Sequence, residues 1–202
     1  LIAFIGLGNV GPEYAATKHN FGFWVADELA RRWNLSFRPG RGRYVYAEHD
    51  FMPSEDDGPA VPAVVAKPTP GMNQSGIGVK EIQSAWDLSL SDLFIIVDDV
   101  DLPLGTLRIR PGGGDASHRG LASVITQLGS TRFPRIRMGI ATSEPLRPAE
   151  DYVLKPFRRK DQPLAREMVV HGGDAVESIL NRGLEKTMSE FNRMEKWEKV
   201  DS

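Results

Sequence analysis

Four polar side chains of the kinds found in hydrolytic sites follow the first apolar stretch of the chain: Asn9, Tyr14, His19 and Asn20. They come soon after Leu1-Ile-Ala-Phe-Ile5, which has the composition of a strand buried on both faces. Open α/β sheets bind their ligands at the edge where such strands end. Histidine supplies a base near neutral pH, and side-chain amides can donate to an oxyanion. The spacing therefore predicts a site at the carboxyl end of a central strand.

Two further strand ends carry residues that suit the same chemistry. The most hydrophobic stretch is predicted to end at Val97, directly before Asp98. Asn73 follows the apolar run 61–66 in a similar way. A carboxylate at this edge can orient an imidazole, and two amides at equivalent strand ends can converge on one substrate. The alternative for Asn73 is that it caps the helix that follows.

Two other kinds of site compete with this interpretation. Gly6-Leu-Gly-Asn-Val-Gly11 matches the pattern of dinucleotide sites, but Pro12 follows where a helix should open. The segment 22–34 is predicted to be helical, so no second strand is available to carry the expected acidic residue. Asp98-Asp-Val-Asp101 has oxygen ligands for a hard cation, but without an EF-hand spacing or a phosphate-anchoring loop. We therefore expect neither a nucleotide nor a metal, and no cofactor.

The charge of the chain is polarised along its length. Residues 101–160 hold eleven Lys or Arg against five Asp or Glu, a net charge of +6, whereas the remainder carries a net charge of −8. A second basic run lies between Arg31 and Arg43. Clustered arginines suit phosphate because the planar guanidinium binds oxygens bidentately. The alternative is that these arginines lie on solvated loops and helix faces.

The elements that must position these residues follow from the pattern of apolar residues and of breakers such as Gly and Pro. Strands are predicted at 1–5, 44–49, 61–66, 93–97, 106–110 and 135–141. Helices are predicted at 22–34 and 75–87, from an N-cap at Ser117 to about 128, and at the C-terminus over 161–197. The Pro-rich segment 144–157 is a candidate lid.

Length and composition limit the remaining possibilities. A chain of 202 residues fits one domain, 1–202, that buries about 70% of the surface of its unfolded form. It has no cysteine, which excludes thiol nucleophiles and fits a reducing compartment. No apolar run approaches the roughly 20 residues of a membrane span, and no signal peptide is recognisable.

Four motifs together resemble the bacterial-type peptidyl-tRNA hydrolase family in order and spacing, over nearly the whole chain. They are Gly6-Leu-Gly-Asn-Val-Gly-Pro-Glu-Tyr14 with His19-Asn20, Lys67-Pro-Thr-Pro-Gly-Met-Asn-Gln-Ser-Gly76, Asp98-Asp-Val-Asp-Leu-Pro-Leu-Gly105, and Arg135-Ile-Arg-Met-Gly-Ile140. The resemblance implies a single α/β domain with a twisted mixed β-sheet flanked by helices. It also implies a metal-free hydrolase that cleaves the ester between peptide and tRNA.

The resemblance implies roles for particular residues. His19 matches the catalytic histidine, and Asp98 matches the acid that orients it. The residues that contact the peptide or position the water in the family correspond to Asn9, Met72 and Asn73.

Other roles concern the wall of the site and the tRNA. Tyr14 matches a residue of the site wall. Arg110 and Arg137 fall where the family places basic residues that face tRNA. The implied partner is peptidyl-tRNA, without a membrane or an obligate protein partner, and we expect a cytoplasmic monomer.

The chain departs from the family at two places, the loop 113–120 and Gly71, which replaces the family's aromatic residue before Met-Asn. Where the family typically has a Gly-Gly-His-Gly-Gly-His-Asn-Gly-like sequence, this chain has Gly113-Gly-Asp-Ala-Ser-His-Arg-Gly120. Arg119 replaces an asparagine that helps to bind substrate or water, so we assign it to the substrate site. There it would bind an oxyanion or phosphate, make His19 a weaker base, or block the peptide channel. It is also the feature that favours an alternative function, a non-catalytic RNA-binding relative of the same fold.

Overall fold

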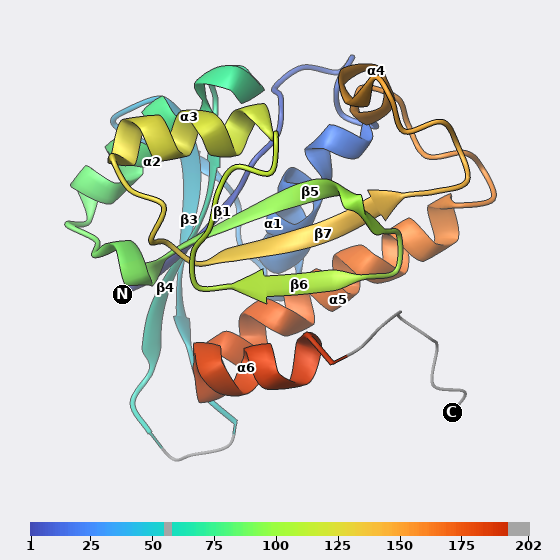
Figure 1. Ribbon diagram of the computed structural model, residues 1–202. Helices are drawn as coiled ribbons and strands as arrows, with labels where there is room; N and C mark the ends of the chain where they lie inside the picture. Colours follow the sequence, from blue (N-terminus) through green and yellow to red (C-terminus); the bar gives the residue numbers. More distant parts are fainter. Residues whose placement is uncertain (55–57, 194–202) are drawn as a thin grey trace.

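Seven strands form one mixed sheet in the computed structural model, which describes residues 1–54 and 58–193 (Figure 1). The strand order is β2-β3-β4-β1-β5-β7-β6, in which β4, β1, β5 and β7 run parallel, while β2, β3 and β6 pair antiparallel with their neighbours. The strands are β1 Ile2–Gly6, β2 Arg38–Pro39, β3 Tyr44–Phe51, β4 Val61–Pro68, β5 Leu93–Pro103, β6 Leu107–Arg110 and β7 Arg135–Ala141. The predicted α/β fold with a mixed sheet is confirmed.

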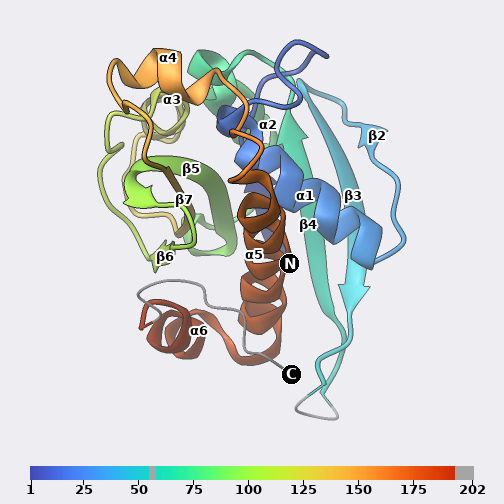
Figure 2. The ribbon, with the colours of Figure 1, turned by 90° about the vertical axis from the view of Figure 1, so that its right-hand side faces the viewer.

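Helices cover both faces of this sheet. Figure 2 shows α1 and α5 side by side on one face, while α2 and α3 pack together on the other. The helices are α1 Phe21–Arg32, α2 Ser75–Ala85, α3 Arg119–Leu128, α4 Ala149–Val153, α5 Gln162–Arg182 and α6 Leu184–Phe191, with the short 3-10 turns η1 Lys18–Asn20, η2 Met72–Gln74 and η3 Leu90–Asp92. Each helix of the described residues is too short or too polar to cross a membrane.

The two faces explain why the central strands are apolar throughout. Phe4 of β1 and Phe94 of β5 belong to the core beneath α1 and α5, with ring centroids 5.1 Å apart. Ile5 and Ile95, one residue further along each strand, belong to the core beneath α2 and α3. Because successive side chains of a strand point to opposite faces, a strand covered on both sides reads as a continuous apolar run.

One strand boundary differs from the prediction in a way that affects the site. β5 does not end at Val97 but continues to Pro103, so Asp98 and Asp99 are strand residues. Their partners in β7 are Met138 and Gly139, and the register shifts beyond Asp99. The sequence suggested an earlier end because charged residues are unusual inside a buried strand, but pairing with β7 keeps this part of the backbone extended.

The C-terminal region contains two helices. α5 ends at Arg182 and α6 begins at Leu184, and Gly183 between them has a φ of +84°, which an L side chain rarely adopts. The predicted helical region 161–197 is therefore confirmed as far as Phe191, and its part beyond residue 193 lies outside the described residues.

Candidate active site

The carboxyl ends of three neighbouring parallel strands meet at one edge of the sheet. β1 leads into a loop that reaches η1 with His19, β4 leads into η2 with Met72 and Asn73, and β5 carries Asp98. The start of α1 lies against these ends, because a Cβ on Gly22 would lie only 2.3 Å from the carbonyl oxygen of Ile96. Glycine at this position lets the backbone approach closely enough to hold η1 over the strand ends.

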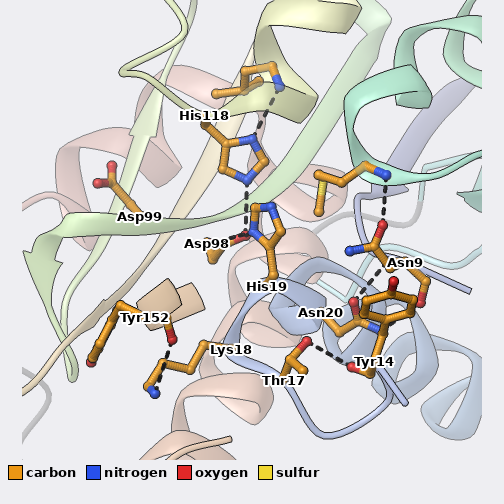
Figure 3. Close-up of polar contacts among 12 residues, drawn as sticks. Asn9, Tyr14, Thr17, Lys18, His19, Asn20, Asp98, Asp99, His118 and Tyr152 are labelled. Atoms are coloured by element: carbon orange, nitrogen blue, oxygen red, sulfur yellow. Dashed lines mark hydrogen bonds and ion pairs between the residues drawn. The ribbon is translucent and has the colours of Figure 1, made fainter. Parts of the chain in front are cut away.

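His19 and Asp98 form the central contact of the site. Nδ1 of His19 lies 2.9 Å from Oδ2 and 3.0 Å from Oδ1 of Asp98 (Figure 3). Asp98 is only 2% exposed, and His19 is 8% exposed. An ionised carboxylate can only accept, so Nδ1 is the protonated nitrogen and Nε2 keeps its lone pair. This arrangement turns the second nitrogen of His19 into an available base.

His118 binds the same carboxylate from the other side. Its Nε2 lies 3.0 Å from Oδ1 of Asp98, and its ring centroid lies 4.8 Å from that of His19. Its Nδ1 accepts from the backbone N–H of Leu121 at 3.2 Å, which makes His118 the N-cap of α3. The predicted cap at Ser117 is therefore wrong: Ser117 has a φ of +60° and lies before the cap. With Nδ1 accepting, Nε2 must carry the proton that it donates to Asp98.

The two imidazoles determine the charge state of Asp98. Burial by itself raises the pKa of a carboxyl group, but the attraction of His19 and His118 and their hydrogen bonds outweigh it and hold the pKa of Asp98 far below its usual range. Asp98 therefore stays ionised throughout the neutral pH range and can serve as a permanent acceptor for both rings.

A second network fixes the amide of Asn9. Asn20 accepts from the backbone N–H of Asn9 at 2.8 Å and donates through Nδ2 to the Asn9 carbonyl at 2.9 Å. Oδ1 of Asn9 in turn accepts from the backbone N–H of Met72 at 2.7 Å. Because Oδ1 is used in this way, the NH₂ group of Asn9 is left as the donor toward the cleft.

Asn73 lies close to Asn9, as we expected from the position of each residue just after the end of a strand. A Cβ on Gly71 would lie 3.5 Å from Oδ1 of Asn73 and 3.9 Å from Oδ1 of Asn9, so both amides border the same small space. Neither η2 nor α2 is capped by the side chain of Asn73. The capping alternative for Asn73 is therefore wrong.

A cavity of about 560 Å³ joins these groups. Asn9, Tyr14, Met72 and Asn73 line it together with His19, Asp98 and His118. Its remaining wall includes the segment 147–154, residues 97–100 of β5, the N-terminus of α3 with Arg119, and Arg137 of β7. A cavity of this kind, mixed in polarity and ending at a histidine–carboxylate pair, can bind a polar substrate beside a general base.

The three predicted arginines have different surroundings. Arg110 is exposed at the end of β6. Arg137 forms an ion pair with Asp99, whose side chain is 5% exposed, so it does not project freely from the sheet. Arg119 forms an ion pair with Glu150 of α4, and both side chains are more than half exposed. Arg119 therefore lies at the rim of the cavity and is directed to the carboxylate of Glu150.

Sequence reasoning missed two residues of this site. His118 was recognised as part of a family motif but was given no role, because histidine is not among the residues that favour N-cap positions and Ser117 was the expected cap. Asn20 was grouped with the polar cluster but was not placed in the site, and its reciprocal bonds to Asn9 become visible only in the folded chain.

His19, Asp98 and His118 also form a set of potential metal ligands, with one ligand atom of each within 4.8 Å of the others. Two imidazoles and a carboxylate suit several divalent transition metals. Here, however, one nitrogen of each ring is directed at the carboxylate itself. A cation between these groups would replace the hydrogen bonds that leave Nε2 of His19 available as a base.

Comparisons with known proteins agree over almost the entire length. The family model described as peptidyl-tRNA hydrolase matches residues 3–199. The chain is 38% identical over 189 residues to a peptidyl-tRNA hydrolase of Geobacillus thermodenitrificans, covering 94% of this chain and 98% of the relative. It is 40% identical over 191 residues to that of Leifsonia xyli subsp. xyli, covering 93% and 95%.

Solved structures share the fold. The crystal structure of peptidyl-tRNA hydrolase from Acinetobacter baumannii superposes with a TM-score of 0.85 at 24% identity, covering 95% of this chain and 94% of that one. A peptidyl-tRNA hydrolase in complex with N-propanol gives the same TM-score at 23% identity, covering 99% and 97%. These likenesses show the fold, and the sequence matches establish that the chain belongs to the peptidyl-tRNA hydrolase family.

Proposed function

We propose that the protein hydrolyses peptidyl-tRNA, cleaving the ester between the carboxyl carbon of the peptide and the terminal ribose to release free tRNA and free peptide. The observation that carries this proposal is the 2.9 Å contact between Nδ1 of His19 and buried Asp98, which leaves Nε2 of His19 as a base inside the cavity. The chain has no cysteine and no G-x-S-x-G motif, so direct attack by water is favoured over an acyl-enzyme.

The reaction follows from the position of that nitrogen. Nε2 of His19 takes a proton from water as the water oxygen attacks the ester carbon. The resulting oxyanion accepts from an amide N–H of Asn9 or Asn73, each of which borders the same space. One such donor contributes on the order of 10²-fold to the rate. As the ester bond breaks, the departing ribose oxygen takes the proton back from Nε2, which restores the neutral imidazole.

Asp98 supports this cycle without changing its own protonation. It fixes the tautomer of His19 and stabilises the imidazolium that forms during the attack. His118 holds the opposite side of the carboxylate, which keeps Asp98 in position.

The remaining predicted residues fit binding roles. Met72, Tyr14 and Asn73 line the cavity near Asn9 and form the peptide side of the proposed site. Arg119, at the rim, is placed to meet a phosphate or the end of the tRNA once its exposed contact with Glu150 is exchanged. Arg110 and Arg137 belong to the adjacent strands β6 and β7 and form the proposed tRNA surface.

We further propose that the protein acts as a monomer in the cytoplasm. Every group that the mechanism uses comes from one chain, and the absence of cysteine suits a reducing compartment. We also propose that residues 1–202 form a single domain in which the segment 144–157 is a lid beside the substrate. The position of 147–154 in the cavity wall supports this role.

The alternative, a non-catalytic RNA-binding relative, is not favoured. The relatives at 38–40% identity carry the name of the enzyme, and the histidine, the carboxylate and both amides are assembled here around one cavity. Arg119, the feature that favoured this alternative, lies at the rim and leaves the base accessible.

Release of the peptide from an N-blocked aminoacyl-tRNA tests the proposal. We expect the wild type to deacylate this substrate and His19→Ala to lose about 10²- to 10⁴-fold in kcat. His49→Ala is the matched control, because His49 stacks on Trp33 and is not among the residues that line the cavity. An inactive wild type contradicts the proposed activity, whereas an active His19→Ala variant contradicts the mechanism.

A further inference from the structure

The residue before the catalytic histidine is a completely buried lysine. Lys18 belongs to η1, the same turn as His19, and its side chain has no exposed surface. A buried ammonium group is costly unless several partners compensate it. The proposed mechanism gives Lys18 no task, so the contacts that hold it require an explanation.

Within residues 1–54 and 58–193, the direct partners of this ammonium group all come from one distant segment, 144–157. Nζ of Lys18 donates to the carbonyl oxygens of Tyr152, Lys155 and Pro156 at 3.4, 3.3 and 3.0 Å. It also lies 3.7 Å from Oε2 of Glu144 and 4.1 Å from the centroid of the Tyr152 ring. Figure 3 shows Lys18 directed toward Tyr152 and away from His19. An ammonium group with three donors suits this cage of carbonyl oxygens.

The backbone strengthens the same connection. The N–H of Lys18 donates to the carbonyl of Lys155 at 3.1 Å, so that residue is bound by both the backbone and the side chain of Lys18. Glu144 is additionally paired with Arg158 at 3.1 Å. The turn η1 and residues 152–156, which we call the base of the segment 144–157, are therefore joined by one network of polar contacts.

This segment is also a wall of the active site. Pro148, Ala149, Val153 and Leu154 line the cavity that contains His19. Toward its exposed end, the segment is held by the pairs Arg147–Asp101 and Arg119–Glu150, whose side chains are all more than half exposed. Exposed pairs of this kind contribute little, so the placement of the wall depends on its buried contacts. These are the contacts of Lys18, the 2.6 Å hydrogen bond from the Tyr152 hydroxyl to the carbonyl of Ile140, and the packing of Tyr152 and Val153 in the core.

The base itself does not depend on Lys18. His19 is held by Asp98, and Asn20 is held by its two bonds to Asn9. Loss of the ammonium group would therefore loosen the wall more than the histidine.

We propose that Lys18 is a positioning residue that anchors the wall 147–154 to the catalytic turn and thereby determines how tightly substrate is held beside His19. This inference rests on the proposed peptidyl-tRNA hydrolase activity. In this proposal, the segment 144–157 is fixed at its base and can move at its exposed end, near Arg147 and Glu150.

The test compares Lys18→Met with Lys18→Arg and with Lys155→Met, a matched control in which an exposed lysine of the same wall segment is replaced. Deacylation of an N-blocked aminoacyl-tRNA is followed at several substrate concentrations and pH values. We expect Lys18→Met to raise KM about tenfold while kcat changes less than threefold and the pH profile keeps its shape. Lys18→Arg should recover most of the KM, and Lys155→Met should resemble the wild type.

Two further measurements keep the proposal testable if Lys18→Met folds poorly. Glu144→Gln weakens the same anchor from its more exposed side and should raise KM in the same direction, by a smaller factor. Amide hydrogen exchange should become faster in 149–157 but not in β5. An unchanged KM in folded Lys18→Met, or a loss confined to kcat, overturns the anchor. An inactive wild type would instead contradict the proposed function, while the exchange measurement would still report on the anchor.

Discussion

One buried carboxylate, Asp98, orients two histidines in this site, and the two rings are protonated on different nitrogens. His19 donates through Nδ1 and keeps Nε2 as a base, whereas His118 donates through Nε2 because its Nδ1 caps α3. The helix cap therefore determines the tautomer of His118, and this tautomer supplies Asp98 with its second donor. The N-cap of α3, which usually affects only helix stability, therefore also helps to hold Asp98 and, through it, His19.

Substitution of His118 separates these two tasks. His118→Asn keeps a good N-cap but is too short to reach Asp98, whereas His118→Ala removes both the cap and the donor. We expect both variants to lower kcat by about tenfold, since an oxygen of Asp98 loses a partner. Both variants lose the hydrogen bond to Asp98, and His118→Ala should lose about 1 kcal/mol more stability than His118→Asn because it also loses the cap. Rate measurements combined with urea unfolding would check this, and an unchanged kcat in both variants would contradict the supporting role.

At the scale of elements, an ion pair between α3 and α4 bridges the mouth of the cavity. These two helices are separated in sequence by β7. Arg119 begins α3, and Glu150 lies in α4, whose segment is anchored at its base by Lys18. Because the Arg119–Glu150 pair is exposed, it is weak enough for a phosphate to replace the carboxylate. The arginine that departs from the family pattern is thus held at the rim in a readily exchanged contact.

Arg119→Asn and Glu150→Gln should affect substrate binding in opposite directions. If Arg119 meets a phosphate, Arg119→Asn raises KM and reduces the slope of log KM against log salt concentration by about one. Glu150→Gln releases the arginine and should lower KM. Arg166→Asn, an exposed substitution on α5, serves as the control. A lower KM for Arg119→Asn would indicate that the arginine obstructs the site instead.

In the whole molecule, the edge of the sheet that carries the cavity lies beside the basic region 101–160. The cavity lies at the ends of β1, β4 and β5, and residues 101–160, with their net charge of +6, supply β6, β7 and the wall segment next to it. A polyanionic substrate is attracted to that side by a field that salt screens.

Arg110 is the clearest residue with which to test this surface, since Arg137 also supports buried Asp99. Arg110→Ala should weaken binding about equally for different tRNAs and reduce the salt slope by about one, with little change in Tm. Arg166→Ala, on α5, is the control for loss of an exposed arginine. A KM that keeps the wild-type salt dependence in Arg110→Ala would remove this residue from the tRNA surface.

The sequence by itself determined much of this protein. Apolar runs predicted the central strands, since strands covered on both faces need apolar residues throughout. Four motifs in register indicated the family, and His19, Asp98, Asn9 and Asn73 were predicted to meet because parallel strands end at a common edge. These inferences depend on the local sequence pattern and on the strand topology, and both can be deduced from a single sequence.

Only the tertiary structure decided the partners of each polar group. The extension of β5 to include Asp98 required pairing with β7, and the cage around Lys18 required a segment more than 130 residues away in sequence. The pairing of Arg137 with Asp99 likewise arises from adjacent strands rather than from neighbouring residues. Charge and hydrogen bonding act over a few ångströms in space, so the roles of these residues depend on contacts that sequence spacing does not encode.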